Sequence, residues 1–414
     1  MARTPAREVE VRRSPRRPAA VLTVLAALMG TTLTSGPGRG AVADEPCSLP
    51  RTGAHHSEGV DGWNDDYPRP VGALRAVMVF LSFPDAKPKA SPEEIARDYF
   101  PATSDYFEAA SYGRLDLRET VVENWIAMPE PSGTYRIQRD WESDRRSAYL
   151  GDALNAVAPR VDLGEYDIVY LVADPDAPGV DSDATKVVNF DQPVLVDDTE
   201  IRRIVTVFER RPPDRNVLAH ETGHVFDLPD LYNRPEDGFG DWDTHVGDWD
   251  LMGSQFGLSP ELFGWHKWKL GWLTTAHVAC VRATGTSHHT LQPLTAPLDS
   301  GAPGADTRLA VVRTGPHEAL VAEARTPAGN DTSTCTRGVL LYRVRSDVAS
   351  ADGPVEVLDG HPGTSACHAG SVHPRLADAP LETGESYYDE DGGVRVEVGA
   401  RTATGGWDIK ITRG

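Results

Sequence analysis

The sequence has few basic residues relative to acidic ones, and this deficit narrows the range of partners. Its 414 residues contain 41 Lys and Arg against 62 Asp and Glu, which gives a formal net charge of -21. A chain this acidic repels the phosphate backbone of nucleic acids and the surface of anionic membranes. We therefore expect neither nucleic-acid binding nor electrostatic attachment to lipid.

Long apolar runs are also lacking. The apolar stretch from Ala19 to Gly30 is shorter than the ~18 residues that a membrane-spanning helix needs. An arginine cluster from Arg12 to Arg17 precedes it, and the small residues Ala41-Val42-Ala43 follow as an A-x-A cleavage site. We predict a signal peptide over residues 1–43, no membrane span, and a secreted, extracellular protein.

Cysteine is scarce and never forms a C-x-x-C pair, which excludes the common redox and zinc motifs built on that spacing. The four cysteines are Cys47, Cys280, Cys335 and Cys367. In a secreted chain they are expected to form disulfides, for which three pairings exist. We favour a bridge such as Cys335–Cys367 within the last third. Residues 44–72 form either an N-terminal segment or a short prosegment.

Strand and helix patterns alternate over residues 73–274. Apolar runs rich in Val and Phe predict strands, and Ser91-Pro92-Glu93-Glu94 predicts a helix start with Ser as cap and Pro at the first position. The predicted strands are Leu74–Phe83, Arg114–Trp125, Tyr166–Ala173 and Arg203–Phe208, and further helices are expected over Ser104–Ala110 and Trp141–Val157. This alternation predicts one sheet with crossing helices.

The pattern changes after Leu273. Short runs of Val and Leu stand between Gly, Pro, Asp and Ser clusters, and the chain ends in a hairpin-like pair at Val394–Val398 and Trp407–Ile411. We interpret residues 275–414 as a β-sandwich-like domain. The expected class of the whole chain is therefore α+β.

One segment carries the pattern of a metal site. His220 and His224 stand four residues apart, so that on a helix both imidazoles leave from one face. Two such nitrogens can bind one zinc ion. Glu221, next to the first histidine, can reach a water at the metal without binding the metal itself. The H-E-x-x-H pattern thus predicts a hydrolytic zinc centre with Glu221 as general base and acid.

A catalytic zinc needs a third protein ligand, and the sequence offers two. Asp230 lies six residues after His224, beyond a turn near Asp227 that the following Leu228-Pro229 favours. Glu261, in a later segment, is the other candidate. We favour Asp230 and keep Glu261 as the alternative.

Several segments resemble the immune-inhibitor-A family of secreted bacterial zinc metalloproteases. HETGHVFDLPDLY, from His220 to Tyr232, is similar to the family pattern H-E-x-x-H-x-x-G-L-P-D-x-Y, with Asp227 in place of Gly. The segments from Val246 to Gly253 and from Phe263 to Trp272 resemble the family's W-D-x-M and A-W-x-K-x-x-L-G-W segments. Val79–Asp85 and Tyr106–Leu115 resemble its first strand and following helix.

The resemblance implies a zincin-like catalytic domain over residues 73–274, with Met252 in a methionine turn beneath the metal. It also implies that peptide bonds are cleaved in protein or peptide substrates, and we expect a monomer. The alternative is an exported binding protein that combines an inactive zincin domain with a ligand-binding β-domain. Ca²⁺ is a candidate second ion, with Asp174–Asp183 or Glu236–Asp243 as its acidic segment; the alternative is that both segments are solvated loops.

Overall fold

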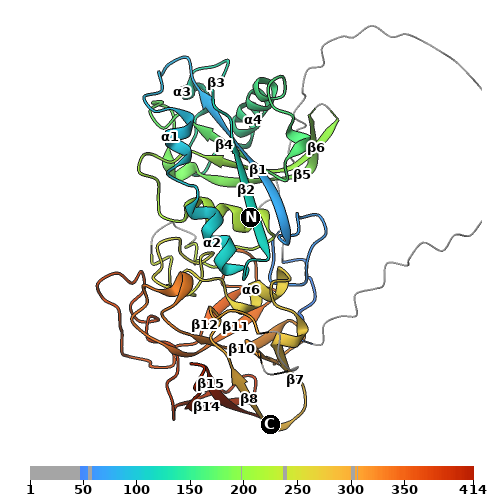
Figure 1. Ribbon diagram of the computed structural model, residues 1–414, viewed down its shortest axis with the longest axis vertical. Helices are drawn as coiled ribbons and strands as arrows, with labels where there is room; N and C mark the ends of the chain where they lie inside the picture. The colour runs from blue at the N-terminus through green and yellow to red at the C-terminus, as the bar shows by residue number, and fades with distance from the viewer. Residues whose placement is uncertain (1–46, 55–57, 197, 236–239, 300–303, 305) are drawn as a thin grey trace, which may run out of the picture.

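The computed structural model describes residues 47–54, 58–196, 198–235, 240–299, 304 and 306–414. The signal peptide predicted over residues 1–43 lies outside this range. One sheet with its helices occupies one end of the long axis, two further sheets occupy the other end, and α2 and α6 lie between them (Figure 1). The chain is of mixed α+β class, as predicted.

The first sheet is mostly parallel. Its strands are β1 (Gly72–Ser82), β2 (Leu115–Val121), β3 (Ile126–Ala127), β4 (Ile168–Ala173), β5 (Lys186–Val196) and β6 (Thr199–Val207). They are ordered β2-β1-β4-β6-β5, with β3 also paired to β1. All six residues of β4 are buried, because chain packs on both faces of the sheet. Only β5 runs antiparallel to its neighbour.

Each α-helix buries apolar residues, and among the described α-helices only α1 has a side-chain cap. The α-helices of this half are α1 (Pro92–Ala96), α2 (Ala102–Ala110), α3 (Ser132–Tyr135), α4 (Ser143–Val157), α5 (Val217–Val225) and α6 (Gly264–Lys269). Short 3-10 turns are η1 (Leu163–Glu165), η2 (Ser182–Ala184), η3 (Thr275–His277) and η4 (Gly329–Asp331). The predicted Ser91 cap of α1 is confirmed: its hydroxyl and the Glu94 side chain form a reciprocal capping box.

The strands of the first sheet differ from the sequence-based prediction in two places. Strand β5, which contains Pro193, was not among the predicted strands. As an edge strand, β5 accommodates the proline with a register shift between Asn189 and Val194. The single strand predicted over Arg114–Trp125 ends at Val121, and a separate two-residue strand follows at β3.

The half that ends the chain contains two antiparallel-rich sheets packed on each other. One has the order β12-β11-β10-β9-β7 and the other β13-β14-β15-β8. Their bounds are β7 (Val278–Val281), β8 (Gly285–Leu291), β9 (Leu309–Arg313), β10 (Glu318–Arg325), β11 (Gly338–Arg345), β12 (Val355–Val357), β13 (Ser386–Asp389), β14 (Val394–Arg401) and β15 (Trp407–Arg413). The predicted terminal hairpin is confirmed as β14–β15.

The middle sheet contributes to two cores. Val312 and Leu320 share one core with Val396 and Ile409 of the last sheet. Residues of the opposite face, such as Val311, share a larger core with α5, α6 and β1. The β-rich half is therefore joined to the first half by continuous apolar packing.

Two disulfides connect distant parts of the chain. Cys335–Cys367 is confirmed, and Cys47 pairs with Cys280 of β7 across 233 residues of sequence. Such bridges fit a protein that folds in an oxidising compartment. No helix among the described residues is long and apolar enough to cross a membrane.

Candidate metal centre

Helix α5 presents the H-E-x-x-H residues from a fully buried position. All nine of its residues, Val217–Val225, are buried, and Val217, Leu218 and Val225 pack into the large core. Met252 lies directly against the helix: a Cβ added at Gly223 would clash with the Met252 sulfur unless that side chain moved. The absence of a Cβ at position 223 therefore lets the Met252 side chain pack against the helix.

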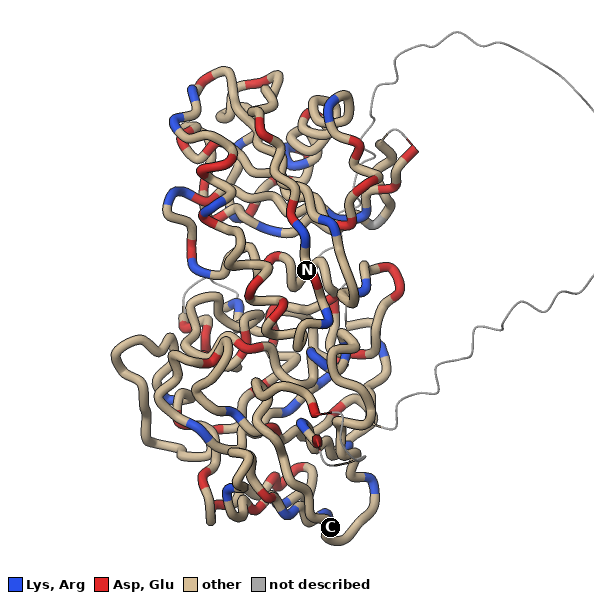
Figure 2. The backbone as a smooth tube through the Cα atoms, viewed as in Figure 1, with Lys and Arg blue, Asp and Glu red and all other residues tan. Residues whose placement is uncertain are grey.

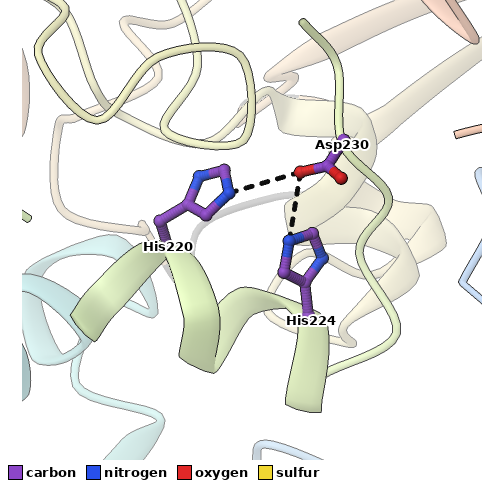
Figure 3. Close-up of side chains that lie close together, drawn as sticks. All are labelled: His220, His224 and Asp230. Carbon is purple, nitrogen blue, oxygen red and sulfur yellow. Dashed lines mark ion pairs between the residues drawn. The ribbon is translucent and has the colours of Figure 1, made fainter. Parts of the chain in front are cut away.

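Three potential ligand atoms converge beside α5. Asp230 Oδ1 lies 3.3 Å from His220 Nε2 and 3.1 Å from His224 Nε2. The two rings leave the helix on one face, and the carboxylate approaches them from the segment that follows (Figure 3). Among the described residues, only these three form a group of His, Cys, Asp or Glu side chains with ligand atoms all within 4.8 Å of one another.

The other ring nitrogens are bound to backbone. His220 Nδ1 lies 2.9 Å from the carbonyl oxygen of Leu251, and His224 Nδ1 lies 2.8 Å from that of Leu228. A carbonyl oxygen only accepts hydrogen bonds, so each Nδ1 is the donor and each Nε2 faces Asp230. This arrangement is common for metal-binding histidines, because the second hydrogen bond fixes the tautomer.

The turn after α5 depends on a buried ion pair. Asp227 adopts a left-handed backbone with φ of 64°, as expected for the turn near this residue. Lys269 of α6 lies 2.8 Å from the Asp227 carboxylate and donates to its carbonyl oxygen at 2.7 Å. Burial raises the pKa of Asp227 to about 6, although Lys269 opposes the rise. Lys269 thus offsets the charge of an aspartate where glycine would need no partner.

Glu221 faces the edge strand of the first sheet. Its Oε2 accepts a hydrogen bond of 2.7 Å from the Val187 N–H on β5. Burial raises the pKa of Glu221, and the nearby His224 and His220 oppose that rise. The carboxylate is therefore a stronger base than an exposed glutamate and stands beside the two imidazoles.

Opposite charges stabilise each other within the three-residue group. Burial by itself lowers the pKa of His224, but Asp230 outweighs it and raises that pKa to about 10. Burial likewise disfavours the charged form of Asp230, yet the two histidines hold its pKa well below the usual range. The group therefore keeps an anionic oxygen in a buried position, where a cation is the favoured partner.

A cleft of about 920 Å³ opens over these residues. Its walls include Val187 and Lys186 of β5, Tyr232, and the exposed Phe256. A second hollow of about 1120 Å³ lies in the β-rich half, where Lys410 and Glu397 pair at 2.6 Å. None of the predicted site residues lines this second hollow.

The remaining candidates lie elsewhere. Glu261 is buried beside Lys267, with 3.1 Å between the carboxylate and the ammonium group, and does not line the cleft. Of the calcium segments, Asp176 pairs with Lys89 at 2.7 Å, while Glu236 and Asp237 lie outside the described residues. Charged residues of both signs are spread over both halves (Figure 2), so the cleft is distinguished by its local chemistry.

Sequence reasoning missed the supporting residues. Tyr232 donates a hydrogen bond of 3.0 Å to Asp230 Oδ2, and Lys269 and Val187 act as described above. The tyrosine could have been found, because it stands two residues after Asp230 in the same short motif. Lys269 and Val187 carry no local signal, since each is more than 30 residues from its partner.

Comparison of the chain with protein-family models finds no match, and comparison with curated proteins finds no relative.

Proposed function

We propose that this chain is a secreted zinc-dependent endopeptidase whose metal is held by His220, His224 and Asp230. The observation that carries the proposal is the convergence of two imidazole nitrogens and one carboxylate oxygen in a buried group with Glu221 beside it. These residues fit zinc, because nitrogen and oxygen donors of this kind and number leave one tetrahedral position open in catalytic sites. Asp230 Oδ1 is buried without a hydrogen-bond donor of good geometry, as a ligand atom would be.

The reaction needs a proton acceptor next to the attacking water. When bound, zinc supplies Lewis-acid chemistry: it polarises a carbonyl oxygen and lowers the pKa of water. Glu221 accepts the proton of the attacking water and then delivers it to the departing nitrogen. Its raised pKa helps the first step, because a more basic carboxylate takes the proton from water more readily.

The choice of peptide bonds rests on two further features. The cleft is open along the edge strand β5, which leaves room for an extended chain rather than only a small molecule. The motifs from His220 to Trp272 resemble those of the immune-inhibitor-A family, which supports a zincin-like fold for the first half and proteolysis as the activity. The two disulfides support secretion.

Replacement of the base tests the proposal. Glu221→Gln keeps the size of the side chain but removes its basicity, so casein hydrolysis should fall by ~10²–10⁴-fold while zinc content and thermal stability stay near those of the wild type. Glu200→Gln, on the exposed part of β6, is the matched control and should hydrolyse casein normally. A chelator should abolish wild-type hydrolysis. Undiminished hydrolysis by Glu221→Gln would overturn the proposal.

The two candidates for the third ligand are separated by metal content. Asp230→Asn should lose most of its zinc, because a neutral amide oxygen is a much weaker ligand than a carboxylate. Glu261→Gln should keep one zinc per folded chain, because Glu261 contacts Lys267 outside the cleft. The opposite result would move the third ligand to Glu261.

A further inference from the structure

The segment that carries Asp230 is held by a loop from the β-rich half. The Asp230 N–H donates to the Ser350 hydroxyl at 2.9 Å, and the Asp230 carbonyl accepts from the Ala351 N–H at 2.9 Å. The Arg234 N–H then donates to the Ala351 carbonyl at 3.0 Å. Both backbone groups of Asp230 are thus bound by residues 120 or more positions later in the chain.

The opposite side of this segment is fixed by the methionine turn. The Leu231 N–H donates to the Met252 carbonyl at 2.9 Å. The Asp230 side chain is held as well, since Tyr232 donates to Oδ2 and leaves Oδ1 facing the imidazoles. Asp230 is therefore fixed by its backbone, its neighbour and its carboxylate at once.

The loop itself has an unusual backbone at the contact. It runs from Ser346 to Pro354 between β11 and β12, and Ala351 adopts a left-handed conformation with φ of 66°. A residue with a Cβ rarely adopts this conformation unless its surroundings impose it. Here the conformation allows the N–H and the carbonyl of Ala351 to bind the Asp230–Arg234 segment together.

The ends of the loop are anchored separately. Arg345 donates to the Gly353 carbonyl at 2.9 Å and pairs with Glu356 at 2.9 Å. Thr52 of the N-terminal segment donates to the Ser346 carbonyl at 2.6 Å. The loop is thus a braced element, and Ser350 is the residue beyond position 275 that lines the cleft within the described chain.

We propose that Ser350 is a positioning residue of the metal centre, and that the β11–β12 loop completes this centre by fixing the backbone of Asp230. The inference rests on the proposed function, because it assigns Asp230 as a ligand. Loss of the Ser350 hydroxyl removes the acceptor of the Asp230 N–H. The Asp230 carboxylate can then move away from the two Nε2 atoms of His220 and His224. Supporting groups of this kind typically contribute ~10–100-fold to metal affinity.

The test measures zinc affinity of the full chain by competition with a chromophoric chelator. Ser350→Ala should weaken zinc binding by about 10-fold, while Ser350→Thr, which keeps a hydroxyl, should bind nearly as the wild type does. Asp347→Asn, an exposed position of the same loop, is the matched control and should leave affinity unchanged. Thermal unfolding of the metal-free proteins is measured in parallel, because a purely structural role would lower stability without changing affinity.

The outcomes separate this inference from the function it rests on. A wild type that binds zinc together with a Ser350→Ala variant of equal affinity would overturn the positioning role alone, whatever the effect on stability. A wild type that binds no zinc would overturn the proposed function and this inference together. A selective loss of affinity in Ser350→Ala that Ser350→Thr restores supports both.

Discussion

The two halves of the molecule contribute to the site in different ways. The half built on the first sheet supplies His220, Glu221, His224 and Asp230 from eleven consecutive residues. The β-rich half, over residues 278–413, supplies only Ser350 to the cleft wall among the described residues. Yet its middle sheet shares a core with α5, and its Arg325 donates to the carbonyl oxygens of Trp249 and Ser259, which lie on either side of Met252 in the sequence. Reactive groups are therefore concentrated in sequence, whereas the groups that hold them are dispersed.

Removal of the β-rich half should have the largest effect on the fold and on the site. A chain that ends at residue 274 would expose the apolar residues of α6 and of the first half that now pack on β9–β11. Because one continuous core cannot be divided without exposing both faces to water, we expect no cooperative unfolding transition and no zinc binding. Circular dichroism during heating measures this. A cooperative melt of the shortened chain would show that the first half folds alone.

A single buried arginine should give the next largest effect. Arg325 bonds to Asp331 at 2.8 Å, to Glu323 at 3.0 Å and to the Trp249 carbonyl at 2.9 Å, with no exposure to solvent. Arg325→Met leaves two buried carboxylates without their counterion and should destabilise the fold by about 4–5 kcal/mol. Arg118→Met, at an exposed pair, should destabilise the fold far less, because solvent screens the two charges. Denaturant unfolding compares the two variants.

Loss of the Lys269–Asp227 ion pair should destabilise the fold less than loss of Arg325, and the destabilisation should depend on pH. Lys269→Met leaves the buried Asp227 carboxylate unpaired and should cost about 3 kcal/mol at pH 8. The folded pKa of Asp227 is raised to about 6, so its protonated form is favoured in the native state, and the cost of ionisation appears as the pH rises through that value. The destabilisation relative to the wild type should therefore shrink at pH 5. An equal loss at both pH values would contradict the assignment.

A double variant sharpens this prediction. Asp227→Asn combined with Lys269→Met removes both charges, and asparagine tolerates the left-handed backbone at this position. The double variant should therefore be more stable at pH 8 than Lys269→Met alone.

The smallest expected effect is the difference between the contributions of the two disulfides to stability. Cys47–Cys280 closes a loop with a sequence separation of 233, and Cys335–Cys367 one with a separation of 32. In the chain-entropy account, the longer loop stabilises more, by roughly 2 kcal/mol. Replacing the first pair by serine should therefore lower the thermal midpoint further than replacing the second. Equal losses would show that loop length does not govern their contributions.

The parts of the site that could be predicted from the sequence are those with a local signal. Helix α5 and the turn near Asp227 were predicted, because the spacing of His220 and His224 and the Pro229 signal are local. The third ligand stayed open between Asp230 and Glu261 in the sequence, since only tertiary structure shows that Glu261 faces Lys267. Lys269 and Ser350 could not be predicted, because they contact the site through a fold that no short pattern encodes.

The edge strand β5 was also absent from the sequence-based prediction. Its Pro193 is disfavoured in a paired strand, and only the one-sided position in the sheet and a register shift make it acceptable. The Val187 N–H that binds Glu221 comes from this strand, so one wall of the cleft was absent from the sequence-based expectation.

The most direct test of the central claim is anomalous X-ray diffraction at the zinc absorption edge from crystals of the chain grown with zinc. The account predicts a strong anomalous peak in contact with His220 Nε2, His224 Nε2 and Asp230 Oδ1, with Glu221 beside it and not in contact. A zinc-loaded crystal without a peak there, or with its peak bound by other residues, would contradict the account.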